Sequence, residues 1–158
     1  MLAGLLPVVI LYFLFRTWRD RRYLKTLPER CGFIPGTYQR TTAGSVWLHA
    51  VSVGEVLSSI ELVRRLQGYE IFVSCATLAG RQVAEEKLAG LTAGIFYAPL
   101  DYVWMVRRVL RRIRPSVLVV LETEIWPNTW HEAKRSGAGV VVVNGRISPA
   151  AFPKYQRW

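Results

Sequence analysis

Hydrophobic residues from position 45 onward fall into two alternating kinds of run. Five short runs rich in valine and isoleucine have the length of β-strands: residues 46–51, 70–77, 95–98, 115–122 and 140–144. Four segments between them carry apolar residues at helical spacing: residues 55–66, 81–89, 102–113 and 128–135. Apolar strands that alternate with helices over short loops are typical of a parallel sheet covered on both faces. The pattern predicts a Rossmann-like, doubly wound α/β domain over residues 45–146, with strand order 3-2-1-4-5.

The first fifteen residues form an apolar run without any charge. A helix of that length spans about 22 Å, less than the ~30 Å of a bilayer's hydrocarbon core, but Thr17, Trp18 and a snorkelling Arg16 bring a span within reach. A cleavable signal peptide would carry its positive charge before the apolar run, whereas here the charges follow it. We interpret residues 1–19 as a signal anchor, and the positive-inside rule then places the rest of the chain in the cytoplasm. A buried N-terminal core helix is the alternative.

The chain of 158 residues carries 21 Lys and Arg against 11 Asp and Glu, a net charge of +10. Nearly all of the excess lies in two segments: residues 16–30 hold six basic and two acidic residues, and residues 107–114 hold five arginines and no acid. Clusters of this kind favour anionic partners such as phosphate groups or anionic lipid. Residues 20–44 are interpreted as a basic juxtamembrane connector, with a short helix over residues 19–27 on the lipid surface. No nucleic-acid partner is expected, because aromatic residues are not interleaved with the arginines.

At 51% hydrophobic and 20% charged residues, the chain is too apolar for disorder and long enough to bury a core of its own. It has two cysteines, Cys31 and Cys75, without a CxxC pattern, and two isolated histidines. This excludes a disulfide scaffold and argues against structural zinc, so we expect no metal site. His49 lies inside the first strand and is expected to be a core residue rather than a catalyst.

Ligands of open α/β sheets bind beyond the carboxyl ends of the strands, where the strand order reverses, here after the first and fourth strands. The first of these loops reads Ser52-Val53-Gly54-Glu55. Ser52 and Glu55 have the spacing of a helix capping box. Gly54 would give a tight turn and let a ligand approach the backbone, and the helix N-terminus favours anionic groups. Both interpretations can hold together, whereas the absence of a GxGxxG motif argues against dinucleotide binding.

The second loop, residues 122–128, reads ETEIWPN. Glu122 and Glu124 lie two positions apart at a strand end and would share one side if the extended geometry continued. A carboxylate at the end of an apolar strand costs free energy to desolvate unless it is paired with a cation or serves a function. Together with Glu55 they can act as a general base or orient substrate hydroxyls, since mutual repulsion raises a carboxyl pKa. The alternative is an ion pair with an arginine such as Arg146.

Three motifs carry a resemblance to a known family. They read HAVSVGE at residues 49–55, ETEIWPN at residues 122–128 and NGRIS at residues 144–148. In order and spacing they resemble the 3-deoxy-D-manno-octulosonic acid (Kdo) transferases of lipopolysaccharide synthesis. The resemblance covers essentially the whole chain, including the N-terminal anchor and the basic connector.

The resemblance implies a GT-B glycosyltransferase, in which two Rossmann-like domains face each other across a cleft. The N-terminal domain would take the lipid A precursor, lipid IVA, and the C-terminal domain would bind the donor CMP-Kdo, without a metal ion or other cofactor. By the same resemblance, Glu55 would be the general base that deprotonates the acceptor hydroxyl, and Glu124 an assisting acid in the same cleft. Six further residues would bind substrate: Ser52, Gly54, Glu122, Asn128, Arg146 and Ser148. The protein would then work at the cytoplasmic face of the inner membrane, next to anionic lipid.

The length departs from the family pattern, because a whole member needs a second domain of comparable size. The chain ends at Trp158, shortly after the fifth strand, so residues 147–158 would begin the crossover to an absent donor domain. We therefore expect a truncated or separately encoded acceptor half, inactive alone and completed by a C-terminal donor-binding domain. The alternative is a non-enzymatic membrane-surface module for anionic lipid, with Glu55 acting only as a helix cap.

Overall fold

The five expected strands form one parallel sheet. The computed structural model describes residues 21–36, 38, 44–122 and 124–145. Its strands are β1 (Ser45–His49), β2 (Ile71–Cys75), β3 (Gly94–Tyr97), β4 (Pro115–Leu121) and β5 (Gly139–Val143). All neighbouring pairs are parallel, in the order β3-β2-β1-β4-β5. The predicted α/β class, parallel sheet and strand order are confirmed, and the reversal of order falls between β1 and β4.

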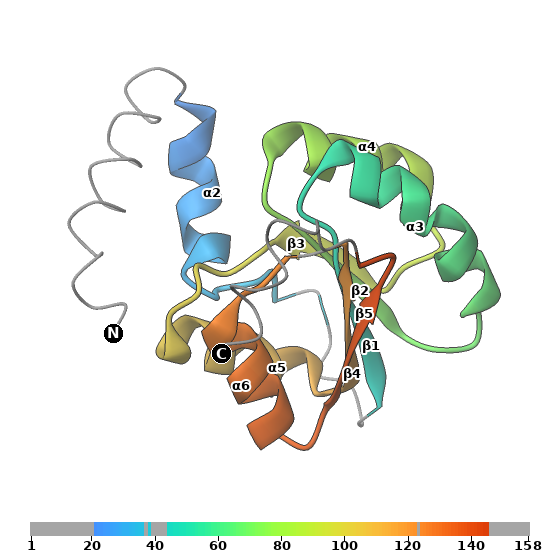
Figure 1. Ribbon diagram of the computed structural model, residues 1–158. Helices are drawn as coiled ribbons and strands as arrows, with labels where there is room; N and C mark the ends of the chain where they lie inside the picture. The colour runs from blue at the N-terminus through green and yellow to red at the C-terminus, as the bar shows by residue number, and fades with distance from the viewer. Residues whose placement is uncertain (1–20, 37, 39–43, 123, 146–158) are drawn as a thin grey trace, which may run out of the picture.

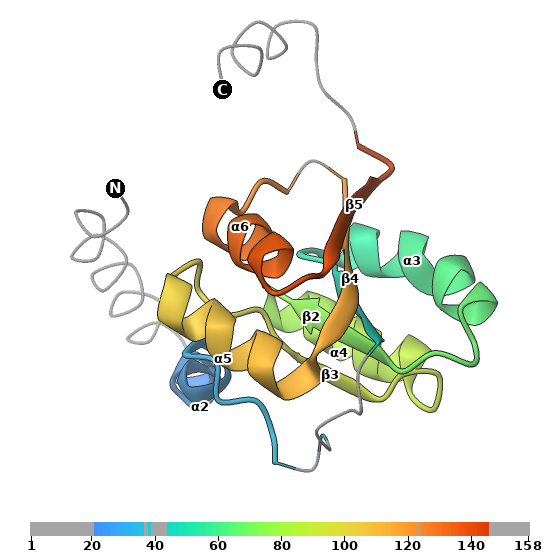
Figure 2. The ribbon, with the colours of Figure 1, turned by 90° about the horizontal axis from the view of Figure 1, so that it is seen from below.

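Helices cover both faces of this sheet (Figures 1 and 2). On one face lie α3 (Val53–Arg65) and α4 (Leu78–Leu88), and on the other α5 (Val103–Ile113) and α6 (Pro127–Arg135). Side chains alternate along a strand, so Val46 and Leu48 of β1 join the core under α3 and α4, while Trp47 joins the core under α5 and α6. Two apolar cores result, which is why the central strands carry apolar side chains on both faces.

β5 is an edge strand and is less buried than its sequence predicts. Its four valines predict a strand covered on both faces, but Val141 is 47% exposed and Val142 is 42% exposed. Among the described strands, β5 pairs with β4 alone. The prediction of a buried strand is wrong here, because a run of valines reports apolar character but not a position in the middle of the sheet.

The basic connector contains α2 (Arg22–Arg30), close to the helix expected there. α2 lies beside β3, at the opposite edge of the sheet from β5 (Figure 1). Thr26 and Arg30 are each 5% exposed, so one face of α2 packs against the domain. The expected signal anchor at residues 1–19 and the expected crossover at residues 147–158 lie outside the described residues. Of the helices that the structure describes, none is long and apolar enough to cross a bilayer.

The N-terminus of α6 is held by an acid from a distant loop. The Asp101 carboxylate accepts hydrogen bonds from the backbone N–H groups of Asn128 (3.1 Å) and Thr129 (2.7 Å) and from the Thr129 hydroxyl (2.8 Å). A carboxylate in this place also meets the positive end of the helix dipole. Asp101 lies between β3 and α5, so one side chain joins α5 and α6 at the carboxyl end of the sheet.

We expect Asp101→Ala to lower the free energy of unfolding by about 1–3 kcal/mol, because two helix N–H groups and a hydroxyl lose their acceptor. Asp101→Asn keeps a carbonyl oxygen at this position and should lose less. Urea denaturation followed by circular dichroism measures both values. Equal stability of Asp101→Ala and the wild type would show that this carboxylate does not stabilise α6.

Candidate active site

Three glutamates gather at the carboxyl edge of the sheet, where the strand order reverses. Glu55 is in the first turn of α3, directly after β1. Glu122 and Glu124 follow β4, the neighbour of β1 in the sheet. The negative charges of Glu124 and Glu122 both act on the Glu55 carboxyl. Two loops that are distant in sequence therefore contribute acids to one place.

The Glu55 carboxylate is buried, and both of its oxygens are engaged. Oε1 accepts a hydrogen bond from the Ser52 hydroxyl at 2.7 Å, and Oε2 accepts one from the Val51 backbone N–H at 2.8 Å. Ser52 Oγ in turn accepts the Glu55 N–H at 3.4 Å, which is the N-cap half of the expected capping box; the Glu55 side chain accepts the N–H of Val51 rather than that of Ser52. Only 4% of Glu55 is exposed. Formation of the α3 N-terminus therefore fixes this side chain in position.

Its surroundings make Glu55 a weaker acid than a glutamate in water. Burial raises the pKa of the Glu55 carboxyl, the hydrogen bonds from Ser52 and Val51 lower it, and the charges of Glu124 and Glu122 raise it. The pKa of Glu55 is raised, as the sequence predicted, although burial contributes more than repulsion between carboxylates. A carboxylate with a raised pKa is a better proton acceptor near neutral pH than an exposed one.

Glu122 and Glu124 do not continue the extended strand. β4 ends at Leu121, and Glu122 has a left-handed backbone with φ 57°. The assumption that strand alternation places both carboxylates on one side is therefore wrong. Glu122 is exposed, whereas Glu124 is partly buried and accepts a hydrogen bond from Trp126 Nε1 at 3.0 Å.

His49 supports Trp126, and through it Glu124, from within the sheet. The His49 and Trp126 rings pack edge to face with centroids 5.0 Å apart, and His49 Nδ1 lies 2.9 Å from Ser74 Oγ. Ser74 Oγ also accepts the Trp47 indole N–H at 2.8 Å, so the Ser74 hydroxyl joins His49 to Trp47 within the sheet. Burial lowers the pKa of His49 to about 4. The prediction of a core histidine is confirmed.

Gly54 lies beside Glu55 in the first turn of α3. Its helical backbone does not form the tight turn expected from the sequence. A Cβ at this position would meet open space, with the Ser52 hydroxyl 4.0 Å away as its nearest neighbour. The fold itself therefore does not require a glycine here.

Asn128 has a partner within the domain. Its Nδ2 donates to the Asp101 backbone carbonyl oxygen at 2.5 Å, which fixes the side chain at the start of α6. Sequence reasoning missed Asp101, because no local pattern connects it with a residue 27 positions later. Arg146 and Ser148 lie outside the described residues, as does any ion pair of Arg146 with the loop glutamates.

The arginines of α5 are partly satisfied within the domain. Arg107 binds Glu132 of α6 at 2.6 Å, and Arg112 donates to the Gly36 carbonyl oxygen at 2.7 Å. The guanidinium of Arg108 lies 3.9 Å from the centre of the Phe33 ring. The arginine segment at residues 107–114 contains no acid of its own, but Arg107 forms an ion pair with an acid on the neighbouring helix α6.

Arginines at the end of α5 and of α6 surround an open cleft of about 570 Å³, here called the arginine cleft. Its charged lining residues are Arg107, Arg111, Arg114, Arg135 and Glu132. Within the described part of the chain, no ion pair is found for Arg111, Arg114 or Arg135. The lining also includes Gly44, which precedes β1, and Pro115, which begins β4. The arginine cleft thus lies at the amino edge of the sheet, at the other end of the strands from Glu55.

The fold is that of the open α/β domains whose ligands bind beyond the carboxyl ends of the strands, where the three glutamates lie. The profile of the family described as 3-deoxy-D-manno-octulosonic-acid transferase matches residues 25–158. Because this match covers most of the chain, the chain belongs to the Kdo transferase family, a family of glycosyltransferases.

Two curated relatives carry the same description, and a third is described as a bifunctional glycosyltransferase. A 3-deoxy-D-manno-octulosonic acid transferase of Haemophilus influenzae is 28% identical over 94% of this chain and 35% of its own length. One of Chlamydophila psittaci is 34% identical over 90% of this chain and 34% of its own length. A bifunctional glycosyltransferase/methyltransferase of Fusobacterium nucleatum is 34% identical over 71% of this chain and 18% of its own length. The chain thus spans about a third of the length of these Kdo transferases.

The raised pKa of Glu55 predicts a pH-dependent stability that Glu55→Gln removes. The glutamine oxygen can still accept the Val51 N–H, and its amide nitrogen can donate to the Ser52 hydroxyl oxygen. A carboxyl with a folded-state pKa above its unfolded value of about 4.3 stabilises the fold while it is protonated. That contribution is fully present below the unfolded pKa and is lost as the pH rises through the folded-state pKa. We expect the free energy of unfolding of the wild type to fall relative to Glu55→Gln as the pH rises from about 4.3 through the folded-state pKa. Urea denaturation at several pH values measures the difference, and a constant difference would contradict the raised pKa.

Proposed function

We propose that this chain is the acceptor-binding, N-terminal half of a GT-B enzyme that transfers Kdo from CMP-Kdo to the lipid A precursor lipid IVA. The observation that carries the proposal is a buried carboxylate, Glu55, at the ligand edge of a Kdo transferase family domain. The names of the relatives from H. influenzae and C. psittaci support the sugar that is transferred. The acceptor rests on the resemblance of the three motifs.

Glu55 acts as the general base in this proposal. The acceptor hydroxyl attacks the anomeric carbon of Kdo, and its proton passes to the Glu55 carboxylate as the new C–O bond forms. The bond between the anomeric carbon and the CMP phosphate oxygen breaks, and its electron pair leaves with CMP. Each Glu55 oxygen uses one lone pair for its fixed hydrogen bond from Ser52 or Val51, which leaves a lone pair free for the incoming proton.

The neighbouring residues orient the acceptor. Glu124, held by Trp126, is the assisting acid, and its charge together with that of Glu122 helps to keep the pKa of Glu55 raised. The open space beside Gly54 admits the sugar ring next to the base. The proposed substrate-binding residues are Ser52, Gly54, Glu122, Asn128, Arg146 and Ser148.

The proposed setting is the cytoplasmic face of the inner membrane. Residues 1–19 serve as the anchor, and anionic lipid is the partner of the basic connector and the arginine cleft. A C-terminal donor-binding domain supplies CMP-Kdo, in keeping with Kdo transferase relatives of about three times this length.

In a two-domain protein that joins this chain to the donor domain of a relative, Glu55→Gln should lower the transfer rate by about 10²–10⁴-fold, the usual contribution of a general base. Its circular dichroism spectrum should match that of the wild type, because glutamine can keep the cap. Transfer is measured with CMP-Kdo and lipid IVA.

Glu61→Gln is the matched control, since Glu61 is an exposed acid on the same helix, 64% exposed at its side chain. It should transfer at the wild-type rate. Retained transfer in Glu55→Gln would remove the assignment of the base, whereas a wild-type two-domain protein that transfers no Kdo to lipid IVA would overturn the proposed function itself.

The arginine cleft favours a second candidate, a non-enzymatic membrane-surface module for anionic lipid. Four arginines surround it against one acid among its described lining residues. Guanidinium groups without an ion pair attract phosphate headgroups, and this attraction weakens with salt.

The two candidates differ in a vesicle-flotation experiment with this chain. We expect Arg111→Gln/Arg114→Gln to reduce the salt-sensitive part of binding to anionic vesicles by about 30-fold, at about 1 kcal/mol for each of the two arginines. Arg64→Gln/Arg65→Gln on α3 is the charge-matched control and should bind like the wild type. Tighter binding when lipid IVA is added supports the transferase, and indifference to lipid IVA supports the module.

A further inference from the structure

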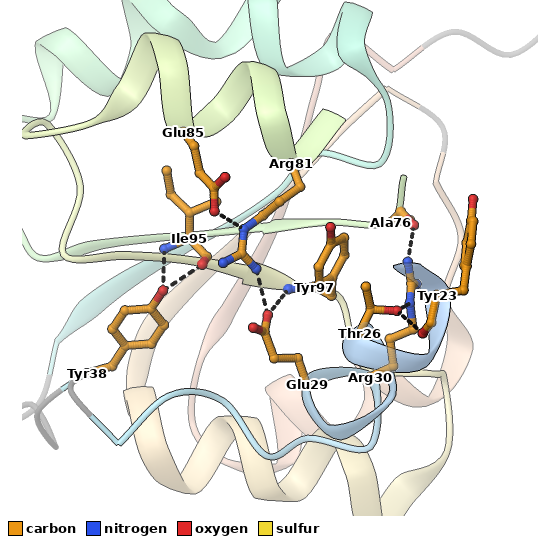
Figure 3. A network of polar contacts seen from close by, with 10 residues as sticks. All are labelled: Tyr23, Thr26, Glu29, Arg30, Tyr38, Ala76, Arg81, Glu85, Ile95 and Tyr97. Atoms are coloured by element: carbon orange, nitrogen blue, oxygen red, sulfur yellow. Dashed lines mark hydrogen bonds and ion pairs between the residues drawn. The ribbon is translucent and has the colours of Figure 1, made fainter. Parts of the chain in front are cut away.

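α2 is joined to the domain by two adjacent residues, Glu29 and Arg30 (Figure 3). Arg30 is 5% exposed, and it donates from Nη2 to the Ala76 carbonyl oxygen at 2.7 Å and from Nε to the Thr26 hydroxyl at 3.0 Å. Ala76 directly follows β2, at the carboxyl edge of the sheet. A guanidinium group can make both bonds at once because its donors point in fixed, different directions.

Glu29 holds the beginning of α4 in a similar way (Figure 3). One of its carboxylate oxygens accepts hydrogen bonds from Arg81 Nη1 at 2.6 Å and from the Tyr97 N–H at 2.7 Å. The guanidinium groups of Arg30 and Arg81 both lie against the Tyr97 ring, 4.8 Å and 4.9 Å from its centre. α2 therefore holds residues 76–81 at two points.

This segment lies against the loop that carries the candidate base. The N–H groups of Ala76 and Thr77 both donate to the Val51 carbonyl oxygen at 3.3 Å, and the Thr77 hydroxyl donates to it at the same distance. A Cβ on Gly80 would come within 3.4 Å of the Val51 carbonyl oxygen and of the Ser52 carbonyl carbon. α4 thus begins in close contact with the backbone of Val51 and Ser52.

Val51 faces Glu55 with its other polar group. Its N–H donates to Glu55 Oε2 at 2.8 Å. Hydrogen bonds therefore form a continuous path from Arg30 through Ala76 and Val51 to the Glu55 carboxylate. A displacement of Ala76 would act on the Val51 carbonyl group and, through the Val51 Cα, on the N–H that faces the carboxylate.

We propose that Arg30 is a positioning residue for Glu55, because it holds the Ala76 carbonyl and so sets where the Val51 N–H lies against the carboxylate. The inference rests on the proposed function, in which Glu55 accepts the proton of the acceptor hydroxyl. A general base is effective only when its oxygen is held within a fraction of an ångström of its productive place. Arg30 brings the basic helix α2 and the base into one hydrogen-bonded unit.

A purely structural role for Arg30 has different consequences. If Arg30 only attached α2 to the sheet, its loss would lower stability without changing the surroundings of Val51 or Glu55. The two roles predict different results for two measurements on an Arg30 variant: the amide chemical shift of Val51 and the pH dependence of kcat.

The test is Arg30→Met, which keeps an aliphatic stem and removes both hydrogen bonds. In the two-domain protein we expect kcat to fall about tenfold while KM changes by less than about twofold. The acid limb of the kcat profile should move to higher pH, because a weakened bond from Val51 stabilises the ionised carboxylate less. In this chain alone, labelled with 15N, the Val51 amide proton should move upfield.

Arg65→Met is the matched control, since Arg65 forms an exposed ion pair with Glu61 and its side chain is 78% exposed. It should leave kcat, its acid limb and the Val51 amide unchanged. Should Arg30→Met not fold, Arg30→Lys replaces it: the ammonium group is one bond nearer the backbone, so the charge stays while the contact with Ala76 is lost. We expect the same shifts in the same directions.

A folded Arg30 variant with an unchanged Val51 amide and an unchanged acid limb would overturn the proposal, even if its Tm fell. The Val51 amide is measured without donor or acceptor. Failure of the positioning role is therefore distinguishable from failure of the proposed transfer, which the wild-type two-domain protein reports.

Discussion

The hydrogen bonds of Val51, between the end of β1 and the start of α3, are the interactions on which the site depends. The carbonyl oxygen of Val51 accepts the N–H groups of Ala76 and Thr77, and its N–H donates to Glu55. One residue thereby joins the central strand, the beginning of α4 and the cap of α3. β1 lies between β2 and β4 with a close-packed core on each face, so a shift of this backbone is resisted from both sides.

Three features could be predicted from the sequence. The strands follow from local periodicity, and their order follows from general rules of chain connection. The cap of α3 follows from two residues three positions apart, Ser52 and Glu55. Contacts between distant side chains could not. Arg107 with Glu132, Thr129 with Asp101, and Arg30 with Ala76 join residues 25 to 46 positions apart, and no periodic signal connects them. The exposure of β5 and the left-handed Glu122 escaped prediction for a related reason, since both depend on the place of a residue in the sheet rather than on its type.

The excess of positive charge is divided between the two ends of the sheet. Arg22, Lys25 and Arg81 line a cleft of about 300 Å³ beside Tyr97, at the same carboxyl edge as Glu55. The arginine cleft lies at the amino edge, and strands of this length separate the two edges by roughly 20 Å. A phosphorylated sugar whose hydroxyl meets Glu55 is therefore nearer to the basic residues of α2 and α4 than to those of α5. Two clusters that look alike in the sequence therefore have different neighbours in the fold.

The capping role of Glu55 and its proposed role as a base do not compete. A cap needs only an acceptor three residues into the helix, and a glutamine supplies one without a charge. Here the acceptor is a buried carboxylate with two further glutamates nearby, an arrangement that raises its pKa and opposes its ionisation. The helix cap does not require a charged residue at this position. Features that cost stability and that the fold does not need are found mainly at functional sites. The capping bonds then serve a second purpose, because they fix the direction in which the remaining lone pairs of the carboxylate point. The interactions that begin α3 are thus the same ones that would hold a base ready for an acceptor hydroxyl.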